Sequence, residues 1–231
     1  MQSARGDDCW TDENKLQRQY DYMEKHPECS LCAHNTGKAK MFHDWKKIHI
    51  LTEEEVFLQW KVHTSSFFMR RNAVISVEKR FWFGDYMVLT QAFSEGQVAA
   101  LPHVMSTYHC NNPNGVLRKI NNLEMEEKIK KERARIEYLR EFNIKTQFRY
   151  DEIIQARCKS IDYYCLQIEC DYIILHSGSK SLSRLRQKRW LPIITTQNIW
   201  EAKKESEDGL GDTDTGGIYF TLYGSISCGI Q

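Results

Sequence analysis

The chain lacks any apolar run approaching the roughly 18 to 20 residues that a bilayer crossing requires, although 41% of its 231 residues are hydrophobic. The stretch from Met1 to Asp21 is polar and acidic, without the basic start and apolar core of a secretory signal. A near balance of 32 basic and 31 acidic residues excludes a strong positive field over the whole protein. We therefore expect a cytoplasmic protein with no transmembrane segment.

Catalytic motifs are also missing. The sequence has no glycine-rich phosphate loop, no nucleophile elbow and no His-Glu helix motif. His103, His109 and Cys110 could be combined into a nucleophile and a base, but proximity in sequence says nothing about geometry. These observations favour a protein without enzymatic activity.

The chain has eight cysteines, and we do not expect them to form a disulfide framework. Cys158, Cys165 and Cys170 fall on one predicted helix, where the first two would be separated by roughly 10 Å along the axis. A disulfide requires Cα atoms within about 7 Å of each other. We expect the thiols to be reduced, as is typical of the cytosol.

Glycine and proline are absent from the whole of 116–177. A dense turn signal, Asn111 to Gly115, precedes this stretch, and Gly178 follows it. These breakers divide the chain into a mixed α/β region (1–110), a long helical segment (116–177) and a tail (178–231).

Within the helical segment, apolar side chains step alternately by four and three residues, which is a heptad seam. Its positions are Ile154, Cys158, Ile161, Cys165, Ile168, Tyr172 and Leu175. Because the segment contains neither glycine nor proline, it could form one continuous helix of roughly 90 Å. A helical hairpin bent near Asn143 to Thr146, where helix propensity falls, would be more compact. Packing within the chain is the ordinary role of such a seam, but its charged flanks make it a candidate for binding a partner helix.

The N-terminal region predicts a small antiparallel sheet with helices, so the expected fold class is α+β with a short β-containing tail. Residues 11–25 read as a helix stopped by Pro27, and Thr52 with Glu55 forms a capping box ahead of a second helix. Three β-rich runs follow at 61–69, 73–83 and 86–93. Gly84-Asp85 suits a hairpin turn between the last two runs.

Cys29 and Cys32 have the spacing of one half of a zinc site, and His34 and His43 lie close in sequence. These four residues are the candidate metal ligands. A second closely spaced cysteine pair is missing, so the alternative is a pair of ordinary reduced cysteines.

A group of cations lies in the tail, ahead of Trp190: Lys180, Arg184, Arg186, Lys188 and Arg189. Such a basic patch beside an aromatic ring can bind the phosphates of nucleic acids or of lipid headgroups. A solvated helix face is the commoner interpretation.

The stretch from Gly211 to Ser225 is an acidic, glycine-rich loop followed by a strand in which Ile218, Phe220 and Leu222 alternate. With Trp190 to Thr196 as a preceding strand, residues 190–225 resemble the start of a lipoxygenase-homology (PLAT) β-sandwich. The resemblance implies membrane or protein association rather than catalysis. The alternative is a strand that joins the N-terminal sheet.

The function that these features favour is a non-enzymatic structural protein that docks onto partner proteins through its long helix. A cytoskeletal, axonemal or ciliary filament would be a suitable partner for an extended, coiled-coil-like seam. Two alternatives remain open: a zinc-dependent nucleic-acid-binding module, and a lipid- or membrane-associated adaptor.

Overall fold

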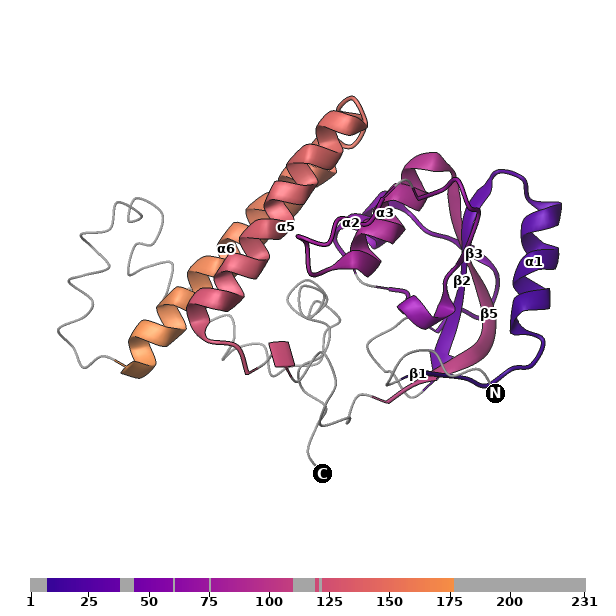
Figure 1. Ribbon diagram of the computed structural model, residues 1–231, viewed down its shortest axis with the longest axis horizontal. Coiled ribbons are helices and arrows are strands. Elements are labelled where there is room, and N and C mark those ends of the chain that lie inside the picture. Colours follow the sequence, from indigo (N-terminus) through magenta and orange to yellow (C-terminus); the bar gives the residue numbers. More distant parts are fainter. Residues whose placement is uncertain are drawn as a thin grey trace, which may run out of the picture.

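The computed structural model describes residues 8–37, 44–59, 61–74, 76–109, 119–120 and 122–176 (Figure 1). A sheet and its covering helices come first in the chain, and two long helices follow. The strands are β1 (Asp8–Trp10), β2 (Cys29–Gly37), β3 (His49–Ile50), β4 (Phe68–Met69) and β5 (Gln97–Tyr108). The helices are α1 (Lys15–Lys25), α2 (Glu53–Phe57), η1 (Thr64–Ser66), α3 (Gly84–Glu95), α5 (Met125–Lys145) and α6 (Asp151–His176). The α+β fold class predicted from the sequence is confirmed.

The sheet has the strand order β1-β5-β2-β4, with β3 also pairing with β5. The β1–β5, β2–β4 and β3–β5 pairs are antiparallel, but the central β2–β5 pair is parallel. The sheet is therefore mixed, and the expectation of an antiparallel sheet is wrong at its centre. A parallel pair needs a long crossover, and the chain between β2 and β5 supplies it with α2 and α3.

The two faces of the sheet enter separate hydrophobic clusters, as the alternation of side chains along a strand requires. α1 covers one face and α3 the other, with α2 beside α3 (Figure 1). Leu31, Ala33, Val98 and Ala100 belong to the large core on the α3 side. The smaller core on the α1 side consists of Met23 of α1 with Cys29, Cys32, Ala99, Leu101 and Met105.

Residues 86–93 lie in helix α3, so the predicted strand and its Gly84-Asp85 hairpin are wrong. A short apolar run fits a buried strand and a buried helix equally well, and packing decides between them. Here Tyr86, Leu89 and Thr90 point inward from one helical face. The Thr90 hydroxyl lies 2.5 Å from the Tyr138 hydroxyl of α5, which fixes α3 against the hairpin. Of the other two runs, 61–69 contains the short helix η1 and the two-residue strand β4, and 73–83 contributes no strand among its described residues.

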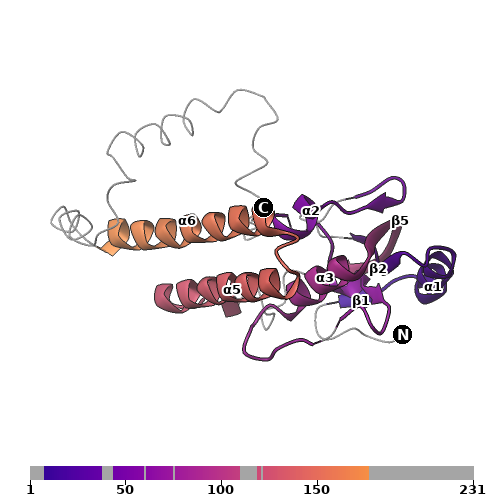
Figure 2. The same cartoon turned by 90° about the horizontal axis from the view of Figure 1, so that it is seen from above.

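The segment between the breakers folds back on itself. α5 and α6 lie side by side as an antiparallel hairpin (Figures 1 and 2). Of the two alternatives left open by the sequence, the hairpin is correct and the single long helix is wrong. The turn occupies residues 146–150, next to the predicted bend at Asn143 to Thr146.

The turn uses a Schellman motif, in which two backbone amides bond back to the last helical carbonyls. The Phe148 amide donates to the Asn143 carbonyl at 2.8 Å, and the Gln147 amide donates to the Ile144 carbonyl at 3.0 Å. Gln147 and Phe148 adopt positive φ angles of 53° and 60°. Glycine normally takes the first of these positions, so the chain makes its sharpest turn without the residue that usually marks one.

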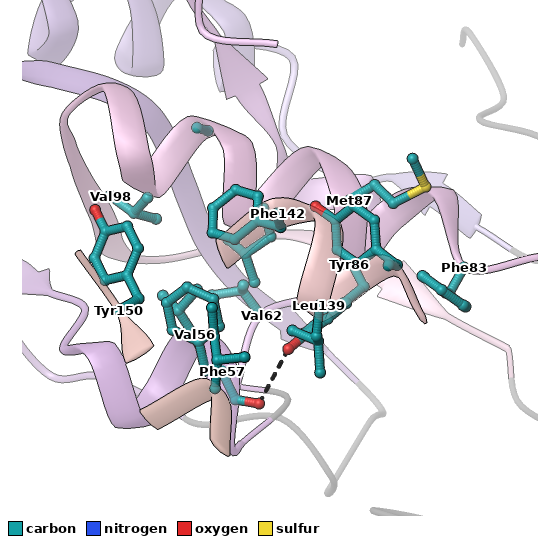
Figure 3. Packing of buried hydrophobic residues seen from close by; sticks show 14 of the residues in the cluster. Val56, Phe57, Val62, Phe83, Tyr86, Met87, Val98, Leu139, Phe142 and Tyr150 are labelled. Atoms are coloured by element: carbon teal, nitrogen blue, oxygen red, sulfur yellow. Dashed lines mark hydrogen bonds between the residues drawn. The ribbon is translucent and has the colours of Figure 1, made fainter. Parts of the chain in front are cut away.

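One large core joins the sheet region to the hairpin, since it runs from Leu31 of β2 to Cys165 of α6. Phe57 of α2 lies at the centre, within 5.3 Å of the Tyr150 ring and 5.9 Å of the Phe142 ring (Figure 3). The sequence divisions at 110 and 116 therefore separate two regions that share a core. Among the described residues, no helix combines the length and apolarity needed to span a membrane.

Candidate functional site

The candidate zinc ligands do not form a zinc knuckle. Cys29, Cys32 and His34 all lie on strand β2, which leaves no turn between the two cysteines, and His43 lies outside the described residues. Burial raises the pKa of the Cys32 thiol to about 12 in the metal-free chain. The Cys29 thiol donates to the Leu31 carbonyl at 3.2 Å. Within the described part of the chain, no group of three or more His, Cys, Asp or Glu side chains is placed to hold a metal.

A buried polar cluster lies on this face of the sheet, beneath α1. Lys15 and Gln19, one helical turn apart, both point inward, and the Lys15 ammonium donates to the Gln19 side-chain oxygen at 2.8 Å. The same ammonium lies 4.4 Å from the centroid of the Trp10 ring, which is a cation–π distance. Burial lowers the pKa of Lys15 to about 8. The cluster therefore contains a lysine that loses its charge more easily than an exposed one.

His63 joins the cluster from the loop before η1. Its Nδ1 lies 2.8 Å from the Ser65 hydroxyl, which in turn lies 2.8 Å from the Ser106 hydroxyl, and its Nε2 lies 3.7 Å from Asp8. An acid–histidine–serine series of this kind can serve nucleophilic catalysis. Here burial lowers the pKa of His63 to about 4, and both serines are buried. The arrangement therefore supports a structural network and does not present a nucleophile to solvent.

Gln19 ties the cluster together, and its replacement by leucine should be measurably destabilising. Its side-chain amide donates at 2.7 Å to the carbonyls of Cys32 and of Ser66, which links α1 to β2 and to η1. In Gln19→Leu both carbonyls are left buried without this donor. We expect the free energy of unfolding to fall by about 2 kcal/mol, measured by urea denaturation. Gln17→Leu on the exposed face is the control, and an equal loss there would contradict the assignment.

The heptad seam is largely covered by the chain itself. Ile154, Cys158, Ile161 and Cys165 are buried in the large core, and Ile168 packs against it. Tyr172 is 42% exposed, and the Leu175 side chain lies outside the described ones. Contact between a partner and the first four positions would require the hairpin to open. Only the end of the seam remains a candidate docking surface.

The hairpin is attached to the sheet region by polar contacts at the edge of the core. Arg80 contacts three carboxylates, those of Glu78 at 2.7 Å, Glu137 at 2.5 Å and Glu141 at 2.6 Å. The Trp82 indole donates to the Lys131 carbonyl of α5 at 3.1 Å. Isolated surface ion pairs contribute little, but a branched network with one arginine fixes geometry. These contacts hold α5 in one orientation.

A second polar cluster, within the core, involves two arginines that no motif in the sequence marks. The guanidinium carbon of Arg135 lies 5.2 Å from the Trp82 and Phe83 ring centroids and 5.6 Å from that of Tyr86. Arg157 of α6 is only 6% exposed, and its Nη1 donates to the Leu58 carbonyl at 3.5 Å. Burial lowers the pKa of Arg157. Arg157 is adjacent to the seam residue Cys158, which is the one sequence signal that could have indicated its burial.

Two predicted features fall outside the described residues. They are the basic patch at Lys180, Arg184, Arg186, Lys188 and Arg189, and the segment 190–225 that resembles a PLAT domain. Both remain predictions from the sequence.

No protein-family model, curated protein or solved structure matches the chain.

Proposed function

We propose that the protein is a non-enzymatic interaction protein that docks onto a partner protein through the far end of its helical hairpin. We define the far end as the first turn of α5, from Met125, and the last turns of α6, from Ile168 to His176. The observation that carries the proposal is the course of the heptad seam. It is buried from Ile154 to Cys165 and becomes exposed at Tyr172.

The lengths of the two helices explain this change. α5 has 21 residues and α6 has 26, and α6 runs beyond the start of α5 (Figures 1 and 2). The seam therefore continues past the helix that covers it. A helix that carries a matching apolar stripe could extend the packing of the hairpin at this point by knobs-into-holes contacts.

Rigidity of the hairpin also supports the proposal, because binding loses less entropy when the docking surface is already ordered. The half of the hairpin nearest the sheet region is fixed by the Phe57 ring contacts and by the Arg80 ion pairs. The far end is thus presented on a stiff support.

The test is site-specific photo-crosslinking in cells that express the protein natively. Tyr172→p-benzoylphenylalanine should give one discrete adduct of higher mass after irradiation, because this position lies on the exposed part of the seam. Tyr163→p-benzoylphenylalanine is the matched control. Tyr163 is 54% exposed on the same helix, but a separation of nine positions at about 100° per residue places it on the opposite face.

Two results would contradict the proposal. Equal adducts at Tyr163 and Tyr172 would indicate contacts that do not depend on the seam. A lack of adducts at Tyr172 would leave the far end without a partner. If the adduct forms, Tyr172→Ser should reduce co-purification of the crosslinked protein at least tenfold, and Tyr163→Ser should not.

A further inference from the structure

Among the described residues, two arginines and one glutamate lie in the core between α3, α5 and α6. Arg135 and Arg157 supply two guanidinium groups, and arginine keeps its proton in proteins. Glu132, which is buried on α5, supplies one carboxylate, 3.7 Å from Arg135. Electrostatic repulsion from Arg135 contributes to the lowered pKa of Arg157, after the larger effect of burial. The two arginines are thus close enough to disfavour each other.

Neither arginine has its hydrogen-bonding capacity filled by the described part of the chain. The Nε atoms of both are buried, and no acceptor among the described residues reaches them. For Arg157 the whole side chain is more than nine-tenths buried. Its one close backbone acceptor is the Leu58 carbonyl, at the long distance of 3.5 Å. A buried charged group with an unused donor is strongly unfavourable unless an acceptor is provided.

Tyr86 of α3 connects the two guanidinium groups. Arg135 lies over its ring at 5.6 Å, and Arg157 interacts with its hydroxyl, which itself donates to the Phe57 carbonyl at 3.2 Å (Figure 3). The rings of Trp82, Phe83 and Tyr86 surround the Arg135 guanidinium. The pair is therefore preorganised rather than free to turn away toward solvent.

We propose that Arg135 and Arg157 bind a small oxyanion, such as inorganic phosphate, at the junction of α3, α5 and α6. An oxyanion supplies the two acceptors that the Nε atoms lack, and arginine binds phosphate and carboxylate oxygens in charge-assisted, often paired hydrogen bonds. The bound anion also offsets the positive charge of the two arginines. Because Arg135 belongs to α5 and Arg157 to α6, the anion joins the two helices of the hairpin.

Thermal unfolding of the purified chain tests this site, with inorganic phosphate as the probe. Ligand that binds only the folded state raises the melting temperature, by roughly 5 to 10 °C at a concentration about 100 times the Kd. Sodium chloride at the same ionic strength should give a much smaller rise. The melting temperature measured with acetate in place of phosphate shows whether the site prefers a carboxylate or a phosphate.

Three variants separate a binding site from a structural pair. Arg157→Met should abolish the phosphate response and, without phosphate, melt at or above the temperature of the unmodified chain, because an uncompensated buried charge is removed. Arg80→Met removes an arginine that already has three carboxylate partners, so it should keep the response. If Arg157→Met does not fold, Arg135→Gln should weaken the apparent affinity for phosphate at least tenfold.

The proposal is overturned by equal effects of chloride and phosphate, or by a full phosphate response in the variant that was measured, whether Arg157→Met or Arg135→Gln. None of these measurements involves a partner protein. The anion site and the docking function can therefore fail independently.

Discussion

Phe57→Ala is expected to lower the free energy of unfolding by about 3 to 5 kcal/mol, as large-to-small changes of a fully buried aromatic residue do. Phe57 is completely buried, and its ring lies 5.9 Å from Phe142 near the end of α5 and 5.3 Å from Tyr150 in the turn just before α6. It also meets Phe93 of α3 at 6.1 Å. One side chain of a short helix thus joins the sheet region to both ends of the hairpin turn.

The measurement is urea denaturation, followed by far-UV circular dichroism and by tryptophan fluorescence. Most of the helix in the described residues belongs to α5 and α6, whereas Trp10 and Trp45 report on the sheet region. Because the core is continuous, both signals should shift together to lower urea. A variant in which fluorescence changes early while the helical signal is unaffected would show that the hairpin is stable on its own, contrary to the shared core.

Phe148→Ala is the matched control. Phe148 is 61% exposed at the hairpin turn and has a φ of 60°. This conformation is strained for a bulky residue. Replacing the Phe148 ring by the alanine methyl group should change the free energy of unfolding by less than about 0.5 kcal/mol. Phe148→Gly should stabilise the chain slightly, since glycine adopts positive φ without strain.

The hairpin shows what the sequence could and could not predict. The seam from Ile154 to Cys165 was identified by its spacing, and these are the positions that α6 buries. The turn was placed only as one of two alternatives, because Gln147 and Phe148 take conformations that usually require glycine or asparagine. Backbone hydrogen bonds to Asn143 and Ile144 compensate for this, and they leave no signature in the sequence.

The central strands were missed for a different reason. β2 contains Cys29, Asn35 and Gly37, and its partner β5 contains Pro102, so neither shows the apolar alternation expected of a strand. The β2–β5 register shifts between His34 and Asn35, opposite Pro102, which lets β5 accommodate a residue without a backbone amide. Side chains on both faces of this pair are buried in the two hydrophobic clusters. The strands therefore lack the exposed polar face that produces an alternating pattern.

The candidate sites depend on burial, which spacing in the sequence does not reveal. The cysteine spacing suggested zinc, but burial beneath α1 converts Cys29 and Cys32 into core residues. The two arginines gave no signal of their own, because Arg135 and Arg157 look like the many cations on helix surfaces. A charge becomes informative only when packing removes it from water.

The capping box of Thr52 and Glu55, in contrast, depends on local sequence alone. It is confirmed by reciprocal bonds of 3.3 and 2.9 Å between the two residues. Local hydrogen-bonding patterns of this kind can be predicted from neighbouring residues, whereas burial depends on segments far apart in the chain.

Acid should unfold the protein through two buried histidines. Burial lowers the pKa values of both His34 and His63 to about 4. The ordinary histidine pKa of 6.5 applies to the unfolded chain, so between pH 6.5 and 4 the unfolded state binds more protons than the folded state. Stability is therefore complete above about pH 7 and is lost as the pH falls toward about 4. With about 1.4 kcal/mol for each unit of pKa difference, each histidine removes up to about 3 kcal/mol.

The contacts explain why the neutral rings are preferred. His63 Nδ1 accepts the Ser65 amide at 3.2 Å, and a proton on that nitrogen would remove the acceptor. His34 Nδ1 lies 2.8 Å from the Asn35 carbonyl, while its buried Nε2 has no acceptor among the described residues to receive a second proton. Repulsion from the nearby Lys15 ammonium adds to the effect at His34.

Replacing both histidines by neutral side chains should flatten the pH dependence. In His34→Gln/His63→Asn, asparagine keeps an acceptor for the Ser65 amide, since it is a preferred capping residue, and neither new side chain titrates. Urea denaturation at about pH 7.5 and about pH 4.5 should show a fall of several kcal/mol for the unmodified chain and a much smaller fall for the double variant. His103→Gln removes an exposed histidine and should leave the full difference in place. An undiminished fall in the double variant would assign acid unfolding to the carboxylates instead.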